Sequence, residues 1–200
     1  MSKREPGILT LGLTLAIFAA AACVVLAFVY QGTREIIDLR QQADLEAALL
    51  DLFPGADQFS DITGKLQSPD PSVSFEGIYE ARQGQTLIGA ALRVSRGSYG
   101  GPLKALVGVN AGGTIAGVRI LEHQDTPGLG ANAASPSYFV DRSRGLTFTG
   151  QFAGKDVEDP FAVYADVEAV TASTITSAAV AAAVKAAGRA AAPYLGGGRE

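Results

Sequence analysis

The chain has 200 residues, of which 48% are hydrophobic and 18% charged, enough for one membrane segment and one ordinary domain. The formal net charge of −4 argues against nucleic acid as a partner, and the single Cys excludes an internal disulfide. The single His argues against a His-rich metal site, so no metal site is expected.

An uncharged segment occupies residues 7–30. As a helix it spans about 36 Å, enough to cross a bilayer core of about 30 Å with some tilt. Lys3 and Arg4 precede it, so residues 1–6 are expected in the cytoplasm and the main domain in the periplasm. A cleaved signal peptide has a shorter apolar region, and Ala20–Cys23 matches a lipoprotein site only faintly. The segment therefore predicts an uncleaved, single-pass anchor in the inner membrane.

The segment after the anchor predicts a stalk helix and then a domain. Apolar residues recur at spacings near three and four within residues 31–55, and Pro54 ends this pattern. Residues 56–72 are rich in Gly, Ser, Pro and Asp, which predicts a loop at the start of a domain formed by residues 56–194. Residues 195–200 are expected to be a disordered tail.

Four apolar, β-rich runs follow, and short Gly-containing connections join them in pairs. The runs are residues 73–82, 86–94, 103–109 and 114–121. Each pair is typical of a hairpin, so the four predict an antiparallel sheet. Residues 161–170 are apolar enough to predict one more strand. The fold class expected is α+β, with an antiparallel sheet flanked by helices.

An Ala-rich run over residues 178–192 predicts the last helix, because Ala is the best helix former. Thr171, Ser173, Thr174 and Thr176 lie just before it or at its start. A helix N-terminus offers free N–H groups and a positive dipole end, which suit a phosphate. The residue types alone are therefore compatible with a Thr hydroxyl beside a bound phosphate or esterified to one, but they favour the ordinary alternative. The alternative is an ordinary capped helix.

A Pro-Gly turn follows the fourth run, within the sequence Asp125-Thr126-Pro127-Gly128-Leu129-Gly130. The residue types alone predict a loop that leaves a strand. His123, just before it, is interpreted as a structural residue. Gly100 and Gly101 predict either a turn or a close approach of a ligand to the backbone.

Two motifs resemble the FMN-binding domain family. In its flavinylation motif, Glu168 takes the acidic place, Thr171 the hydroxyl place and Thr174 the acceptor place. The chain departs from the family at Glu168, where Asp is usual, and at Ala172-Ser173, where Gly-Ala is usual. The loop with Glu122 and residues 125–130 resembles the segment that the family uses against the flavin.

The resemblance implies that FMN is joined covalently through its phosphate to Thr174. It also implies contacts between the cofactor and both motifs. The implied cofactor-binding residues are Glu122, Thr126, Pro127, Gly128, Leu129, Thr171, Ala172, Ser173, Ile175 and Thr176. No catalytic residue is expected, because a flavin carries electrons itself.

The layout of anchor, stalk and flavin domain resembles the G-subunit family of Rnf-type complexes, with the C subunit of the sodium-translocating NADH:quinone reductase as a near relative. This implies an electron-transfer subunit of an ion-translocating ferredoxin/NAD oxidoreductase, with no independent catalytic activity. The implied partners are other membrane subunits, the lipid bilayer and a flavin transferase. Two alternatives stay open, namely an anchored module that binds flavin noncovalently and a scaffold subunit without cofactor.

Overall fold

A computed structural model describes residues 7–196 and divides the chain into two compact units, residues 1–44 and 45–200. The boundary falls inside α1 (Ile8–Leu52), a continuous helix that includes both the expected anchor and most of the expected stalk. The expected cytoplasmic segment and the last four residues of the expected tail lie outside the described residues.

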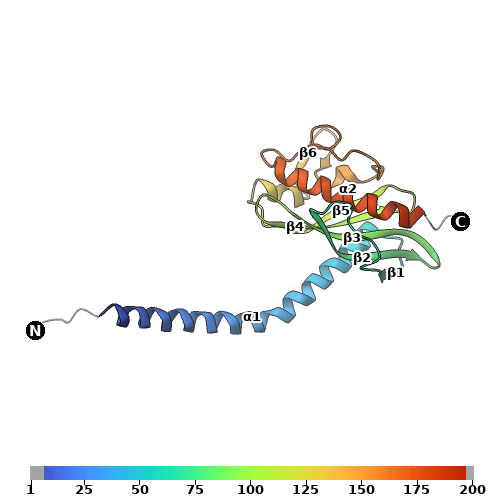
Figure 1. Ribbon diagram of the computed structural model, residues 1–200. Helices are drawn as coiled ribbons and strands as arrows, with labels where there is room; N and C mark the ends of the chain where they lie inside the picture. Colours follow the sequence, from blue (N-terminus) through green and yellow to red (C-terminus); the bar gives the residue numbers. More distant parts are fainter. Residues whose placement is uncertain (1–6, 197–200) are drawn as a thin grey trace, which may run out of the picture. The chain divides into compact units, whose positions relative to one another are not determined.

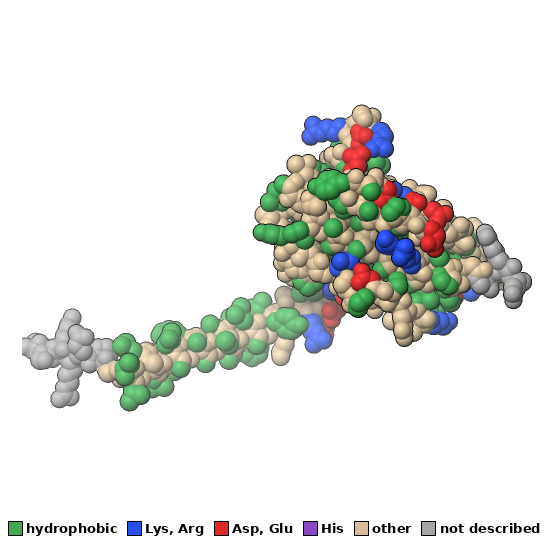
Figure 2. Space-filling view, turned by 45° about the horizontal axis from the view of Figure 1, so that its top comes forward, with side chains coloured by type: hydrophobic (Ala, Val, Ile, Leu, Met, Phe, Trp, Pro, Cys, Tyr) green, Lys and Arg blue, Asp and Glu red, His purple; other side chains and the backbone are tan. Residues whose placement is uncertain are grey.

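The first unit contains the N-terminal part of α1. Its described residues, 7–44, are exposed, and those between residues 8 and 30 are all uncharged and mostly apolar. Figure 2 shows hydrophobic side chains along the visible face of this helix. Among the described residues, α1 alone is long and apolar enough to cross a membrane. The helix therefore has the length and composition of a membrane anchor.

The second unit is built on a five-stranded antiparallel sheet whose strand order follows the chain. Its strands are β1 (Gln58–Asp61), β2 (Val73–Gln83), β3 (Thr86–Gly97), β4 (Pro102–Asn110) and β5 (Ile115–Glu122). Both predicted hairpins are present, with Gly84 (φ 59°) and Gly113 (φ 84°) at their turns. The prediction of a loop throughout 56–72 was wrong at β1, whose four residues form an edge strand against β2.

Successive side chains along each strand point to opposite faces of the sheet, and each face is covered and buried. One face presents Leu92 and Val107 to α2 (Thr174–Gly196), whose inner side is mostly Ala and Val. Small Ala side chains let the helix approach the strands closely, and Figure 1 shows α2 lying across the sheet. The opposite face packs Leu106 against Leu49 in the last turns of α1. The predicted α+β class, with a sheet flanked by helices, is confirmed.

The segment between β5 and α2 is mostly irregular. It contains two 3-10 helices, η1 (Gly130–Ala134) and η2 (Gly150–Phe152), and the short hairpin strands β6 (Phe139–Asp141) and β7 (Leu146–Thr147). The strand predicted over 161–170 was wrong, because these residues form turns with one isolated bridge between Val163 and Val167. Phe148, Phe152 and Phe161 hold the segment together through ring contacts beneath these turns.

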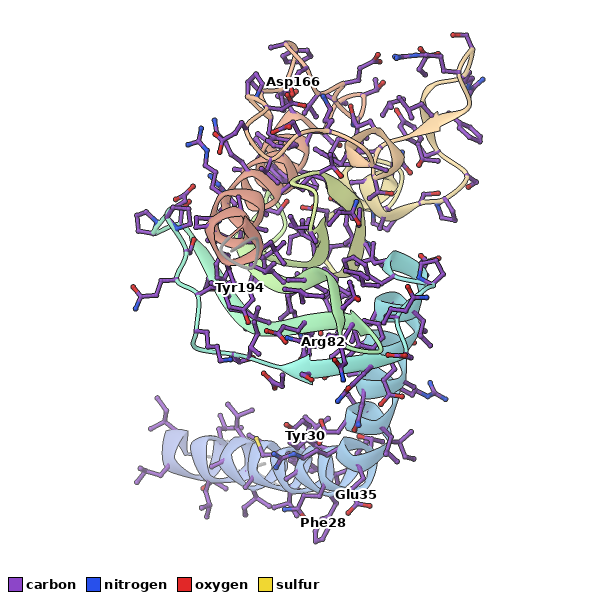
Figure 3. The ribbon with its side chains drawn as sticks, turned by 90° about the vertical axis from the view of Figure 1, so that its right-hand side faces the viewer. Phe28, Tyr30, Glu35, Arg82, Asp166 and Tyr194 are labelled. Carbon is purple, nitrogen blue, oxygen red and sulfur yellow. The ribbon has the colours of Figure 1, made fainter. Side chains whose placement is uncertain are left out.

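The C-terminal end of α2 is fastened to β2 by a polar cluster. Tyr194 donates a hydrogen bond to the buried carboxylate of Glu80, which also accepts one from Arg82 Nε at 3.0 Å. Figure 3 labels Arg82 on the strand and Tyr194 on the helix. The Tyr194 hydroxyl is the main cause that lowers the pKa of Glu80 below its ordinary value. Leu195, assigned from sequence to a tail, is helical and buried.

Candidate functional site

The two sequence motifs meet at one pocket of about 420 Å³. The loop after β5 forms one wall, and the first turn of α2 forms the other. The lining residues are Tyr99, Asp125, Thr126, Leu129, Gly130, Ala172, Ser173, Thr174, Ile175 and Thr176. Pockets of roughly 300–1,000 Å³ hold small molecules and cofactors, so this one has a suitable size.

Asp125 joins the loop after β5 to the loop between β3 and β4. Its carboxylate is buried and accepts hydrogen bonds from Ser98 Oγ at 2.8 Å and Gly100 N at 2.7 Å. A Cβ at Gly100 would lie 2.2 Å from the carbonyl oxygen of Gln124, so only Gly allows these two loops to approach this closely. This contact places the exposed Tyr99 at the pocket.

Gly130 brings the same loop onto α2. A Cβ at this position would lie 2.6 Å from Asp125 Cβ and 2.7 Å from Thr176 Oγ1. Both neighbours are buried, with Thr176 only 1% exposed. The absence of a side chain at Gly130 therefore sets the distance between the walls of the pocket.

The turn Thr126–Leu129 forms as the sequence predicts. Leu129 N donates to Thr126 O at 3.1 Å, and Gly128 has a φ of 79° after Pro127, as in a type II turn. Asn132 Nδ2 donates to Gly128 O at 2.9 Å and fixes the turn against η1. Thr126 and Leu129 line the pocket, whereas Pro127 and Gly128 lie outside its lining.

The residues before α2 adopt an unusual backbone conformation. Ala172 has a φ of 58°, a region that favours Gly. Gly would adopt this conformation without a steric penalty, whereas Ala172 adopts it at a cost of about 1–2 kcal/mol. Ser177 Oγ stabilises the bend by accepting from Val170 N and donating to Ser173 O, both at 2.9 Å.

Ser173 supplies an unpaired polar atom at the pocket. The residue is 7% exposed, and its Oγ has no hydrogen-bond partner among the residues that the structure describes. A buried hydroxyl without a partner costs free energy, so such atoms usually face a ligand or water. Ser173 directly precedes α2, whose first N–H groups have no partner within the helix. Together these groups form a donor set that suits an anion.

Thr174 is the first residue of α2 and is exposed at the pocket. Its Oγ1 lies 2.8 Å from the hydroxyl oxygen of Tyr164. Tyr164 also lines a second, more polar cavity of about 590 Å³ together with Lys155 and Asp166. Thr174 therefore presents an accessible hydroxyl at a helix N-terminus, which is a place that suits a phosphate.

Besides Pro127 and Gly128, two more of the residues implied by the resemblance lie outside the pocket lining. Glu122 forms ion pairs on the sheet with Lys104 at 3.0 Å and Arg93 at 3.6 Å. Thr171 is exposed, and its N–H donates to the Tyr138 hydroxyl at 3.2 Å.

Glu168, which takes the acidic place of the flavinylation motif, also lies outside the pocket. Its side chain pairs with Arg144 at 2.7 Å. Its backbone exchanges hydrogen bonds with the buried amide of Gln151 at 2.7 and 3.0 Å. Glu168 therefore holds in place the irregular segment that leads to Thr174.

Several residues at the site escaped the sequence reasoning. Asp125 and Gly130 were quoted in the loop motif but were not assigned a role. Tyr99 belongs to neither motif, although Gly100 and Gly101 beside it left open a close approach of a ligand to the backbone. Nothing in the sequence pointed to Tyr164, because its loop was interpreted as a strand.

Comparison with known proteins gives the class of protein that this site belongs to. Residues 98–188 match the FMN-binding domain family, which supports FMN as the cofactor. Residues 1–52 match the family described as RnfG N-terminal region. The chain is thus an FMN-domain protein with an apolar N-terminal helix, as its two compact units indicate.

Three similar proteins extend these matches along the chain. The G subunit of the ion-translocating oxidoreductase complex of Cereibacter sphaeroides is 31% identical over 74% of this chain and 65% of its own length. The protein of the same name from Pseudoalteromonas atlantica is 32% identical over 87% and 83%. The G subunit of the proton-translocating ferredoxin:NAD(+) oxidoreductase complex of Clostridium ljungdahlii is 30% identical over 94% and 93%.

The chain belongs to the G-subunit family of ion-translocating oxidoreductase complexes. This confirms the resemblance drawn from the two motifs. The names of the relatives are those of subunits of a translocase, as expected for a redox subunit. The helix that could cross a membrane, found among the described residues, and the ion-translocating complexes named for the relatives together indicate a membrane location.

Proposed function

We propose that this chain is an electron-transfer subunit of an Rnf-type complex and carries FMN through a phosphoester bond to Thr174. The observation that carries the proposal is the pocket in which both motifs meet, with Thr174 exposed at the start of α2. The family supports an electron-transfer role, and the ferredoxin and NAD named for the Clostridium relative are the proposed electron partners of the complex.

The residues at the pocket fit the phosphate of a flavin. Ser173 Oγ is buried and has no partner within residues 7–196, and the first N–H groups of α2 have no acceptor inside the helix. The helix end stabilises a phosphate by about 0.3–1 kcal/mol at a partly exposed site. Thr126 supplies a hydroxyl on the facing wall, and Leu129 and Ile175 supply partly exposed apolar surface.

Bound FMN supplies reversible electron transfer, so the chain needs no catalytic base. The role of the chain's own residues is to hold and orient the group. Thr174 tethers it, Ser173 donates to it, and the loop fixed by Asp125 limits access of water from one side. A covalent tether prevents loss of the cofactor on the outer side of the membrane, which is where we place the domain. The other Rnf subunits, the lipid bilayer and a separate flavin transferase are the proposed partners.

The proposal is tested by in-gel flavin fluorescence after denaturing electrophoresis. The full chain is co-expressed with a flavin transferase and exported, as wild type, Thr174→Ala and Thr171→Ala. Wild type and Thr171→Ala are expected to give fluorescent bands, because Thr171 does not line the pocket, while Thr174→Ala is dark. A fluorescent Thr174→Ala band would move the attachment elsewhere. A dark wild-type band would leave a noncovalent flavin module or a scaffold without cofactor.

A further inference from the structure

Three helical hydroxyl side chains in the described part of this protein turn back to their own helix. Thr14 Oγ1 donates to Leu11 O at 2.9 Å, and Thr33 Oγ1 donates to Val29 O at 2.9 Å. Ser177 Oγ donates to Ser173 O in the same way. This back-bonding is a common choice for hydroxyl residues in helices, and it hides the oxygen against the backbone.

Thr174 differs from these residues in its position and in its partner. It is the first residue of α2, so no complete helical turn lies behind it. Its hydroxyl instead bonds with the hydroxyl of Tyr164 at 2.8 Å. A Thr side chain populates more than one χ1 rotamer when its oxygen has no fixed partner. Tyr164 therefore determines where the oxygen of Thr174 lies.

Tyr164 is held in an unfavourable backbone conformation. Its φ is 67°, and Phe161 in the same loop has a φ of 47°. Such conformations persist when the surroundings enforce them, and they concentrate at functional sites. The phenol is 77% exposed, so burial of the ring does not explain the conformation.

Asp166 enforces the conformation of this loop. Its carboxylate accepts from Ala162 N at 2.7 Å and Phe161 N at 3.2 Å, and Lys155 Nζ pairs with it at 3.1 Å. Figure 3 labels Asp166 in this part of the domain. Burial raises the pKa of Asp166, but these donors outweigh it and the pKa lies below its ordinary value. The carboxylate thus stays charged and keeps the loop closed near neutral pH.

We propose that Tyr164 is a positioning residue for attachment of FMN, which holds the Thr174 hydroxyl toward the incoming phosphate. The reaction forms a bond between Thr174 Oγ1 and the FMN phosphorus of a flavin adenine dinucleotide donor. It breaks the diphosphate bond so that AMP leaves, and the hydroxyl proton passes to a base on the flavin transferase. Nothing is oxidised or reduced in this step.

This inference rests on the proposed linkage at Thr174, and one experiment separates the two. The full chain is prepared in detergent without flavin as wild type, Thr174→Ala, Tyr164→Phe and Tyr30→Phe. Each is titrated with purified flavin transferase and flavin adenine dinucleotide, and attachment is followed by intact mass. Tyr30→Phe is the matched control, because Tyr30 is also an exposed tyrosine, at 61%, but does not line the pocket.

Tyr164→Phe is expected to lower kcat for attachment about fivefold, the effect of one lost hydrogen bond, with KM for the acceptor chain unchanged. Tyr30→Phe is expected to leave both parameters within about twofold of wild type, well below the effect of a lost hydrogen bond. Equal rates for Tyr164→Phe and wild type would overturn the role of Tyr164 and leave the linkage standing. A change confined to KM would make Tyr164 a docking contact and overturn the positioning role. Loading of Thr174→Ala would overturn the linkage itself.

Discussion

Gly130 lies between Asp125 and α2, and we expect Gly130→Ala to destabilise the domain through steric overlap. The new Cβ would lie 2.6 Å from Asp125 Cβ, 2.8 Å from Asp125 Cγ and 2.7 Å from Thr176 Oγ1. Asp125 is unable to move freely, because Ser98 and Gly100 donate to its carboxylate at 2.8 and 2.7 Å. The φ of Gly130 is not in the left-handed region, so the effect isolates sterics from backbone strain.

The magnitude follows from two opposing terms. If the site stays rigid, overpacking costs about 1–3 kcal/mol. If the loop shifts instead, it loses a hydrogen bond to the Asp125 carboxylate, which costs about 1.5–3 kcal/mol. Replacing Gly by Ala returns about 0.4–1 kcal/mol by restricting the unfolded chain. The net free energy of unfolding is therefore expected to fall by about 2 kcal/mol, which lowers Tm by about 4–8 °C for a domain of this size.

Differential scanning calorimetry of the full chain in detergent measures this shift. Gly112→Ala is the matched control, because a Cβ there would meet no described atom within 4 Å and its φ is ordinary. We expect the control to keep the wild-type Tm or raise it slightly. A Gly130→Ala chain that melts at or above the wild-type temperature would refute the close packing of the loop against α2.

Three further predictions concern the supports of the site. Tyr194→Phe removes a donor to the buried Glu80 and is expected to lower stability by about 1–3 kcal/mol in chemical denaturation. Since the pKa of Glu80 is lowered in the fold, its contribution is complete above its ordinary pKa of 4.5 and is lost as pH falls through the folded value. The fall in Tm on acidification should therefore be smaller in Tyr194→Phe than in wild type. An equal fall in the two chains would contradict the role of Tyr194 in lowering the pKa of Glu80. Gln151→Leu removes the buried amide that exchanges hydrogen bonds with the backbone of Glu168, and it should cost about 1–3 kcal/mol in the same assay. Wild-type stability would argue against this support. Ala172→Val should lower stability by more than about 1 kcal/mol and reduce flavin loading, because a β-branched residue disfavours a φ of 58°. Ala172→Gly should keep wild-type stability and loading. Equal loading in the two variants would argue against the bend at Ala172.

Sequence reasoning succeeded where local chemistry decides the structure. The hairpins follow from β-rich runs and from Gly84 and Gly113 at turns with positive φ. The last helix follows from its Ala content, and its start follows from the hydroxyl residues around Thr174. The turn at Pro127 and Gly128 follows from residue types that fix φ. Each of these features is determined within a few residues of the chain.

The sequence failed where one side-chain contact overrides strand composition, or where a strand depends on its pairing partner. Residues 161–170 have strand composition, yet Asp166 draws the N–H groups of Phe161 and Ala162 into a closed loop. This places Phe161 and Tyr164 at positive φ, which no propensity predicts for such residues. β1 is likewise a strand only because it pairs with β2, since its mostly polar residues show no alternation that predicts a strand.

The most direct test of the account locates the flavin on the chain. Trypsin cleaves after Lys155 and Lys185 and releases residues 156–185 as one peptide, which carries every candidate hydroxyl of the motif. We expect fragmentation of this peptide from the exported, transferase-treated chain to place the whole mass of FMN on Thr174. An unmodified peptide, or FMN on Thr171 or Thr176, would contradict the central claim that the pocket between the loop after β5 and α2 carries a flavin tethered at Thr174.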